Sequence, residues 1–474
     1  MKNRIYTSLL LCPIICIVLA ASAADKSAVV KPPKGFTALF NGKDLTGWWG
    51  ASTEDPRKWM ALSPEEFKKK HDASVEDVKQ HWRVENCELV NDGKGLYATT
   101  EKNFRDYELL IDYKTVPKAD SGIYLKGVPQ VQIWDWTKEG GKWKIGADKG
   151  SGGLWNNSPG APGKDPRVRA DKPFGQWNHF RIIQCGSRTW IWFNGKLVVE
   201  NAILENYFGR RKPNAPPPAA TEPIAPLPPE GPIQLQTHGG EIRWRNIFIR
   251  EISPVEANKM LRGKDPKGFQ SVFNGKDLKN WGGPVDCCEV KDKAIVWKEK
   301  KGGTIFTKDE YTNFVARLEF KLAPGGNNGL SIRYPGQGDA AYGAMCECQV
   351  LDDNYEVNKS KLQGKPVTLD PRQSHGSAYG MVPAARGYQR PIGEWNYQEV
   401  TVTGSTLKVE LNGTIILDCD LSKVTEFMGK KAHPGKDRTS GHFGFAGHSD
   451  PVQFRNISIK RLKNCPVAPV PVAR

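Results

Sequence analysis

The sequence predicts an all-β protein made of two tandem antiparallel sandwiches. Three observations predict this class. The 474 residues include 48 glycines, 34 prolines and 10% aromatic residues, which is typical of turn-rich β structure rather than of a helical bundle. Sequence segments recur in the same order in both halves of the chain, and short apolar runs flank an Asn-Gly pair in each half. A mean hydropathy of −0.54 with one long apolar run excludes a polytopic membrane protein.

That apolar run lies in residues 1–23, which have the pattern of a secretory signal peptide. Lys2 and Arg4 precede it, and small residues at 21–23 supply a cleavage site. An uncleaved membrane anchor is the alternative, but the run is short for a span. We therefore expect an exported protein, periplasmic or extracellular, with no membrane span in the mature chain.

The rest of the chain is an internal duplication. The matching pairs are residues 35–45 and 268–278, 175–178 and 393–396, 194–195 and 412–413, and 245–249 and 455–459. Ordered matches at drifting offsets indicate two homologous domains, at residues 35–252 and 268–463, with a linker at 253–267.

Two segments of the first repeat need separate explanations. Residues 51–81 are an insertion, in which Ser63 and Ser74 each precede acidic residues in the pattern of a capped helix start. We expect two short surface helices there. The proline-rich residues 213–232 precede the last strands of the repeat, so we expect a semi-rigid loop rather than a domain linker.

Strand patterns fill both repeats. Apolar runs flank Asn194-Gly195 and Asn412-Gly413, and an Asn-Gly pair between such runs predicts a tight hairpin because both turn residues need positive φ. Within residues 122–126, alternation places Ile123 and Leu125 on the core face, with Tyr124 and Lys126 opposite.

The same alternation predicts a polar face in each repeat. Its members are Tyr124, Lys126, Gln130, Gln132, Gln236 and His238 in the first repeat, and Arg333, Glu347, Gln349 and His448 in the second. Trp155 and Tyr379 follow small-residue turns, where a ring can stack on a sugar. Amides, aromatic rings and a few ionisable groups suit a polyhydroxylated ligand. The alternative is an ordinary solvated sheet face.

Charge and cysteine patterns exclude several functions. The net charge is +16, but the basic residues are dispersed and form no nucleic-acid motif, so specific nucleic-acid binding is not predicted. None of the eight cysteines after the signal segment forms a C-x-x-C. Cys346 and Cys348 flank Glu347, and we favour buried or bridged structural thiols over a metal site.

No familiar hydrolase or cofactor motif is present. G-x-S-x-G, H-E-x-x-H, the Walker A loop and G-x-G-x-x-G are all missing from the sequence. A glycosidase with paired carboxylates is an open alternative, but spacing does not distinguish Asp120 with Glu241 from Glu347 with Asp352.

As a set, the motifs resemble the 3-keto-disaccharide hydrolase family, also described as 3-keto-glucoside 1,2-lyase and 3-keto-2-hydroxy-glucal hydratase. The residues that carry the resemblance are 35–48, 120–125, 131–135, 231–239 and 245–247, and more loosely 376–380 and 454–457. The resemblance implies that each repeat is a concanavalin A-like jelly roll with a sugar-binding concave face.

The resemblance also implies a reaction. A ketone at C3 of a sugar acidifies the C2 proton, so that a base removes it, the C1 substituent leaves by elimination, and water adds to the product. The net result is hydrolysis of a 3-keto-glycoside. Oxidation at C3 belongs to another protein, so no nicotinamide cofactor is expected. The alternative is a non-catalytic carbohydrate-binding protein.

This chemistry requires a base and a group that stabilises the enolate. His238 and His448 are the first acid or base candidates, and Glu347 is another. Gln130 occupies the position of Glu347 in the first repeat, so the same carboxylate is not available there. We expect Lys126 or Arg333 to stabilise the enolate.

A divalent metal ion is the alternative stabilising group, with Asp135, Asp352 or a histidine as ligand. The sequence alone shows no coordination set.

Overall fold

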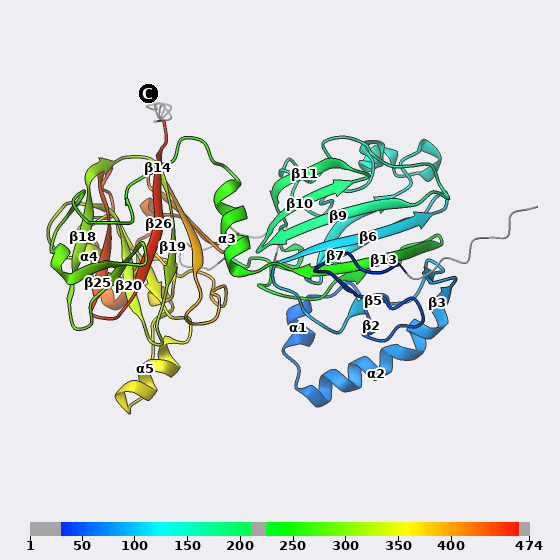
Figure 1. Cartoon of the computed structure of the whole chain (residues 1–474), viewed down its shortest axis with the longest axis horizontal. Coiled ribbons are helices and arrows are strands. Elements are labelled where there is room, and N and C mark those ends of the chain that lie inside the picture. The colour runs from blue at the N-terminus through cyan, green and yellow to red at the C-terminus, as the bar shows by residue number, and fades with distance from the viewer. Residues whose placement is uncertain (1–29, 210–223, 464–474) are drawn as a thin grey trace, which may run out of the picture.

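The computed structural model describes residues 30–209 and 224–463. The predicted signal peptide at residues 1–23 lies outside these ranges, and so do residues 213–223 of the proline-rich segment. The described chain forms two β sandwiches, side by side (Figure 1), which confirms the predicted all-β class with tandem sandwiches. Within the described residues, no helix combines the length and apolar character needed to cross a membrane.

The first sandwich packs a large sheet, ordered β11-β10-β9-β6-β13-β4-β3 with β1 on β13, against a smaller sheet ordered β2-β5-β12-β7-β8. All paired strands are antiparallel. The strands are β1 (Thr37–Ala38), β2 (Trp48–Ala51), β3 (Trp82–Glu85), β4 (Glu88–Asn91), β5 (Tyr97–Thr100), β6 (Tyr107–Thr115), β7 (Asp120–Leu125), β8 (Val128–Trp134), β9 (Asn178–Cys185), β10 (Arg188–Phe193), β11 (Lys196–Ile203), β12 (Gln234–Leu235) and β13 (Ile242–Glu251).

The second sandwich repeats this arrangement, with sheets ordered β16-β17-β26-β19-β22-β23-β24, where β14 pairs with β26, and β15-β18-β25-β20-β21. Its strands are β14 (Gln270–Ser271), β15 (Trp281–Gly282), β16 (Cys288–Lys291), β17 (Ala294–Trp297), β18 (Gly302–Tyr311), β19 (Phe314–Lys321), β20 (Asn327–Tyr334), β21 (Cys346–Leu351), β22 (Asn396–Thr403), β23 (Thr406–Leu411), β24 (Thr414–Asp420), β25 (Gly441–His448) and β26 (Gln453–Arg461). Short helices α4 (Ala340–Gly343) and α5 (Tyr355–Gln363) extend from it.

The predicted hairpin turns have the expected backbone. Asn194 and Gly195 have φ values of 48° and 79°, and Asn412 and Gly413 have 49° and 85°. Positive φ at both residues matches the twist of the strands that they join. The duplication seen in the sequence is therefore present in the backbone of the two sheets.

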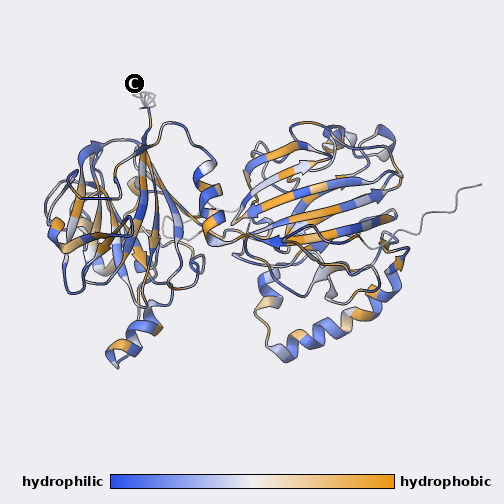
Figure 2. Ribbon diagram, in the orientation of Figure 1, coloured by the Kyte–Doolittle hydropathy of each residue, from blue (hydrophilic) through white to orange (hydrophobic). Residues whose placement is uncertain are grey.

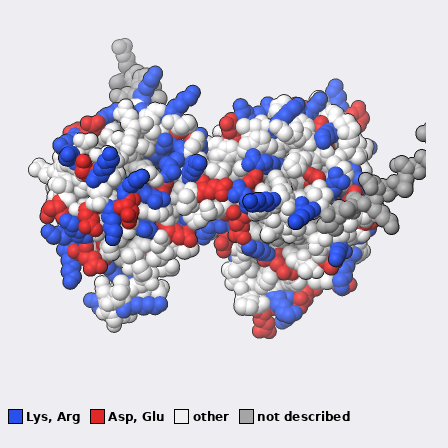
Figure 3. Space-filling view, viewed as in Figure 1, with Lys and Arg blue, Asp and Glu red and all other residues white. Residues whose placement is uncertain are grey.

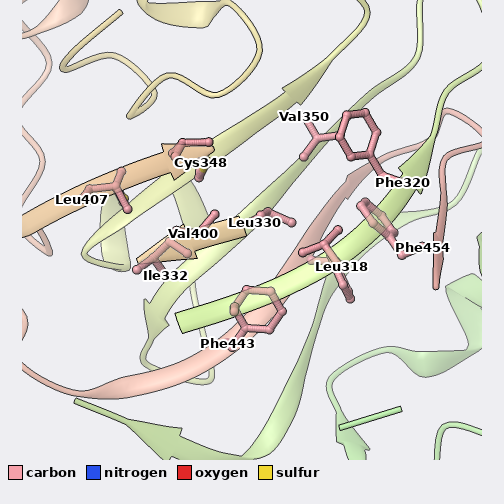
Figure 4. Close-up of a cluster of buried hydrophobic side chains, with 14 of the residues drawn as sticks. Leu318, Phe320, Leu330, Ile332, Cys348, Val350, Val400, Leu407, Phe443 and Phe454 are labelled. Atoms are coloured by element: carbon pink, nitrogen blue, oxygen red, sulfur yellow. The ribbon is translucent and has the colours of Figure 1, made fainter. Parts of the chain in front are cut away.

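Alternating side chains build the two cores, as predicted. Ile123 and Leu125 are fully buried in the first domain. In the second, Leu330 and Ile332 of β20 and Cys348 of β21 lie in the core (Figure 4). Apolar and polar residues alternate along many strands (Figure 2). All seven cysteines of the described part of the chain are free thiols.

The insertion forms helices α1 (Pro56–Met60) and α2 (Pro64–His81). Ser63 caps α2 as predicted, and the capping box with Glu66 is complete. The predicted second helix start at Ser74 is wrong, because α2 continues through it. The Ser74 hydroxyl is buried and donates to the carbonyl of His71 one turn earlier, so it behaves as an interior residue of the helix.

The predicted linker is mostly helix α3 (Pro254–Gly263), which lies between the sandwiches (Figure 1). Its residues Ala257 and Leu261 pack in one buried cluster with Cys185 of the first domain and Tyr397 of the second. The segment therefore works as a packed spacer rather than a flexible tether.

Polar contacts across the seam between the domains reinforce this cluster. Arg188 of the first domain pairs with Glu410 of the second at 2.5 Å, and Lys264 contacts the other oxygen of Glu410 at 2.7 Å. Burial would raise the pKa of Glu410, but Lys264 and Arg188 lower it to about 2. The backbone turns also meet, since Ser187 N donates to Gly413 O at 3.1 Å.

Charge is spread over the surface rather than concentrated. On the face seen in Figure 3, Lys and Arg are scattered over both domains, with Asp and Glu between them. This distribution agrees with the dispersed basic residues of the sequence.

Candidate functional site

The smaller sheet of each sandwich carries the predicted polar residues, and strand register shows which ones correspond. Gly122 pairs with Gln132 in the first domain, as Gly329 pairs with Gln349 in the second. Asp120 opposite Trp134 likewise corresponds to Asn327 opposite Leu351.

In the second domain, these residues line a cavity of about 240 Å³, which we call the second-domain cavity. Its lining residues are Asn327, Asp339, Ala341, Tyr342, Glu347, Gln349, Leu351, Tyr355, Leu369, Gln373, Tyr379 and His448. Four predicted site residues (Glu347, Gln349, Tyr379 and His448) thus lie together. The mixture of tyrosine rings, amides and carboxylates suits a sugar ligand.

Glu347 is the most constrained of these residues. Its side chain is 3% exposed, and its Oε1 lies 3.5 Å from Nε2 of His448. Among the described residues, this oxygen is buried without a hydrogen-bond partner. Burying a carboxylate oxygen without a hydrogen-bond partner costs free energy. We therefore interpret this oxygen as a contact point for a ligand or a reacting proton.

A glycine makes room for that carboxylate. A Cβ at position 329 would overlap Oε1, Cγ and Cδ of Glu347, far inside the 3.0 Å that real Cβ atoms keep. In the first domain, a Cβ on Gly122 would overlap the side chain of Gln130 in the same way. In both domains, the glycine lets the facing side chain lie flat across the neighbouring strand.

His448 ends β25 at the mouth of the cavity, with its side chain about half exposed. The interaction with Glu347 raises the pKa of His448, and burial opposes this shift only partly. The carboxylate therefore favours the protonated form of the imidazole.

Tyrosine hydroxyls provide further donors in the cavity. Tyr379 Oη accepts a hydrogen bond from Gln373 Nε2 at 3.2 Å, which leaves its own proton free to donate to a ligand. Burial raises the pKa of Tyr379, so the hydroxyl keeps this proton. The ring of Tyr342 stands edge-on to Tyr379, with Lys431 over its face at 3.4 Å.

The first domain builds a different arrangement, which we call the first-domain cluster: Asp120, Gln130, Gln132, Lys142 and His238. His238 Nδ1 lies 2.8 Å from Oδ2 of Asp120, and Lys142 forms an ion pair with the same oxygen. Gln132 donates to Oδ1 of Asp120 at 2.7 Å and accepts from Gln130 at 2.6 Å.

Comparison of the two sites shows that the carboxylate beside the histidine has changed strand. In the second domain it comes from β21, as Glu347, while β20 carries the amide Asn327. In the first domain β8 carries the amide Gln130, and β7 carries the carboxylate Asp120. Each histidine therefore keeps one acidic partner.

Three other residues predicted for the first-domain site are Tyr124, Gln236 and Trp155. Tyr124 is buried, with its hydroxyl 3.0 Å from that of Thr53. Gln236 is buried, and its Oε1 has no partner in the described part of the chain. Trp155 packs edge-on against Trp134 at the end of β8, with centroids 4.9 Å apart.

Lys126 and Arg333 do not place their charges in either site, which corrects the expectation for both. Lys126 is fully buried, and its Nζ donates to the carbonyls of Gly186 and Pro229 at 2.9 Å. The Arg333 guanidinium donates to backbone carbonyls, including Thr312 O and Gly404 O. Both residues follow a register shift and have positive φ (56° and 52°), so the strand alternation on which the prediction depended ends before them.

Asp135 and Asp352, the predicted metal ligands, instead hold loops. Asp135 accepts from the backbone of Lys118 and Thr137. Asp352 accepts from the backbone of Gly325 and Asn354. Within residues 30–209 and 224–463, no three His, Cys, Asp or Glu side chains are grouped closely enough to hold a metal ion. A divalent metal stays a prediction.

Sequence reasoning missed several residues of the two sites. The sequence suggested Asp120 only within one of two alternative carboxylate pairs, and it gave no indication of Lys142, Asp339 or Tyr342. One sequence feature pointed to Asp120: it precedes Gly122 by two residues, as Asn327 precedes the corresponding Gly329. Lys142 and Tyr342 lie in loops whose course no local pattern predicts.

A β sandwich whose small sheet carries a cavity of amides, tyrosines and a histidine–carboxylate pair defines a carbohydrate-active class of protein. Sequence comparison identifies the family. Residues 35–250 and 268–460 each match the 3-keto-alpha-glucoside-1,2-lyase-like domain, so the chain belongs to that family and contains two copies of its domain. This confirms the resemblance found in the sequence.

One curated protein and two solved structures are also similar to parts of the chain. A 3-keto-disaccharide hydrolase of Bacteroides thetaiotaomicron is 25% identical over 254 residues, which cover 45% of this chain and 86% of that protein. A solved structure from Parabacteroides distasonis, provisionally assigned as a glycosyl hydrolase, is 27% identical and covers 41% of this chain and 99% of its own, with a TM-score of 0.36. The carbohydrate-binding module CBM66 of Bacillus subtilis is 11% identical and covers 39% of this chain and 97% of its own, with a TM-score of 0.26.

Proposed function

We propose that the protein is an exported enzyme that cleaves 3-keto-glycosides in the second-domain cavity. One observation carries the proposal: the buried Oε1 of Glu347 has no hydrogen-bond partner and lies beside His448 at a cavity that suits one sugar unit. The family and its named relative supply the substrate class. Residues 1–23, with the pattern of a signal peptide, support export.

The proposal gives each group a role. Glu347 removes the C2 proton, and the electron pair forms an enolate with the C3 ketone. Tyr379 donates a hydrogen bond to the developing enolate oxygen. The C3 carbonyl then re-forms, a double bond forms between C1 and C2, and the C1–oxygen bond breaks.

His448 completes the proton balance. Its raised pKa favours the protonated imidazole, which can give a proton to the departing oxygen. Water then adds across the C1–C2 double bond: His448 takes a proton from the water as its oxygen bonds to C1, and Glu347 returns its proton to C2, which gives the free 3-keto sugar. No oxidant is consumed, because the ketone is present in the substrate.

Product analysis tests this proposal. The mature protein is mixed with 4-nitrophenyl 3-keto-glucoside and with its unoxidised parent, each with and without EDTA. We expect cleavage of the keto substrate alone. Glu347→Gln should lower kcat by about 10²–10⁴-fold and largely spare binding, as measured by calorimetry. Loss of activity with EDTA would indicate an essential metal ion.

A matched control is Glu299→Gln, the same chemical change at an exposed residue of the same domain. It should leave kcat and KM unchanged. Sugar binding without any product from the wild-type protein would refute the proposal and favour the alternative, a non-catalytic carbohydrate-binding protein.

A further inference from the structure

We propose that the first domain holds a second acid–base centre, made of Asp120, His238 and Lys142, in which the imidazole rather than a carboxylate removes the C2 proton of a 3-keto sugar. This inference rests on the proposed function, because it assumes the same substrate class. It assigns chemistry to a domain that lacks the glutamate of the other copy.

Asp120 is placed to orient the histidine and not to act as the base. Its side chain is 10% exposed, and both of its oxygens are occupied: Oδ2 by His238 Nδ1 and Lys142, Oδ1 by Gln132. A buried carboxylate bonded to one ring nitrogen fixes the orientation and tautomer of an imidazole, and stabilises the imidazolium when a proton arrives.

His238 presents its other nitrogen to the outside. Its side chain is 55% exposed, and no residue in the described ranges forms a hydrogen bond with Nε2. In the second domain the arrangement is reversed, because there the carboxylate contacts Nε2 and keeps its own oxygen without a hydrogen bond. The basic atom without a hydrogen-bond partner in the described residues is therefore an imidazole nitrogen in the first domain and a buried carboxylate oxygen in the second.

Lys142 provides an ammonium group beside Asp120. The Lys142 side chain is one-third exposed. An ammonium group has three donors, so the ion pair leaves others for a substrate oxygen. The residues that line the second-domain cavity include no lysine or arginine. The structure thus pairs an imidazole base with a cationic enolate stabiliser in the first domain.

The step is balanced without any further reagent. Nε2 of His238 takes the C2 proton, and the electron pair forms the enolate of the C3 ketone beside Lys142. The C3 carbonyl re-forms, the C1–C2 double bond forms, and the C1–oxygen bond breaks. The imidazolium then protonates the departing oxygen, which returns His238 to its neutral form.

The test removes the second-domain base and asks what activity is left. In the full chain, Glu347→Gln is compared with the double variant Glu347→Gln/His238→Gln for turnover of 4-nitrophenyl 3-keto-glucoside and for exchange of its C2 proton in D₂O. We expect measurable turnover and exchange in the single variant and a loss of both by at least about 10²-fold in the double variant.

The other two members have distinct signatures. In the Glu347→Gln background, Asp120→Asn should lower kcat with little change in KM, as expected for a residue that positions the base. Lys142→Met should also lower kcat, and Lys142→Arg should restore most of it, because a cation is retained.

The control is His179→Gln. His179 also pairs with an aspartate, Asp112, at 2.7 Å, but on the larger sheet of the same domain. It should not change the residual rate, and circular dichroism should show the same fold for every variant.

The outcomes separate the two proposals. If the wild-type protein turns over the keto sugar but the single and double variants have equal turnover and equal exchange, the second centre is refuted and the proposed function stands. If the wild-type protein neither cleaves nor exchanges the keto sugar, both are refuted.

Discussion

Replacing Gly329 with alanine should damage the second-domain site without unfolding the protein. Gly329 does not have positive φ, so alanine fits the backbone there. The new Cβ, however, would fall about 1 Å or more inside an ordinary van der Waals contact with three atoms of Glu347. The carboxylate must therefore move by about 1 Å from its place beside His448.

A displacement of about 1 Å in a reacting group costs roughly 10²-fold in rate. We expect Gly329→Ala to lower kcat for a 3-keto-glucoside by about that factor, and overpacking to lower the free energy of unfolding by about 1–3 kcal/mol. Steady-state kinetics and urea unfolding measure the two effects separately.

Gly122→Ala is the matched control, because it introduces the same overlap with Gln130 in the first domain. Its stability cost should be similar, with little loss of the rate due to the second domain. A Gly329→Ala protein with wild-type kcat would show that the position of Glu347 does not limit the reaction.

Three further predictions concern ionisable groups. The raised pKa of His448 should fall in Glu347→Gln, as measured by NMR titration. In the wild-type protein, the stability that this imidazolium contributes is present in acid and is lost as pH rises through its raised pKa. Glu410→Ala should lower the free energy of unfolding by about 3–5 kcal/mol in urea, because it leaves the largely buried Arg188 without its carboxylate and Lys264 with Glu399 as its remaining partner. Glu200→Ala in an exposed pair should cost less than about 1 kcal/mol. Burial lowers the pKa of Lys126 to about 8, so stability should rise between pH 8 and 10.5 by about 3 kcal/mol, and Lys126→Met should remove that rise.

Most of the fold could be predicted because it depends on local or repeated signals. The duplication, the Asn-Gly turns and the alternation at Ile123 and Leu125 are all visible in the sequence. Helix α2 was predicted in two parts because Ser74 has the sequence of a cap. Its hydroxyl bonds to a carbonyl of the preceding turn instead, and local sequence does not distinguish these two uses of serine.

The sites were less predictable because they depend on register between strands. Glu347 and His448 were found from alternation and titration chemistry, and the cavity holds both. Lys126 and Arg333 were misplaced because a register shift reverses the side-chain direction at one residue. Asp120 was missed because its correspondence with Asn327 appears only when the β7–β8 pair of the first domain is aligned with the β20–β21 pair of the second.

The seam between the domains bears on how the chain became double. The β9–β10 turn at Gly186 contacts the β23–β24 turn at Gly413. The two domains therefore meet through turns that do not correspond to each other in the repeated fold. The corresponding corners, at Gly404 and Gly195, have open space where a Cβ would be. A symmetric dimer joins identical patches about a twofold axis, whereas this contact is head-to-tail. The tandem protein therefore does not preserve the interface of an ancestral twofold dimer, because its two domains meet through different surfaces.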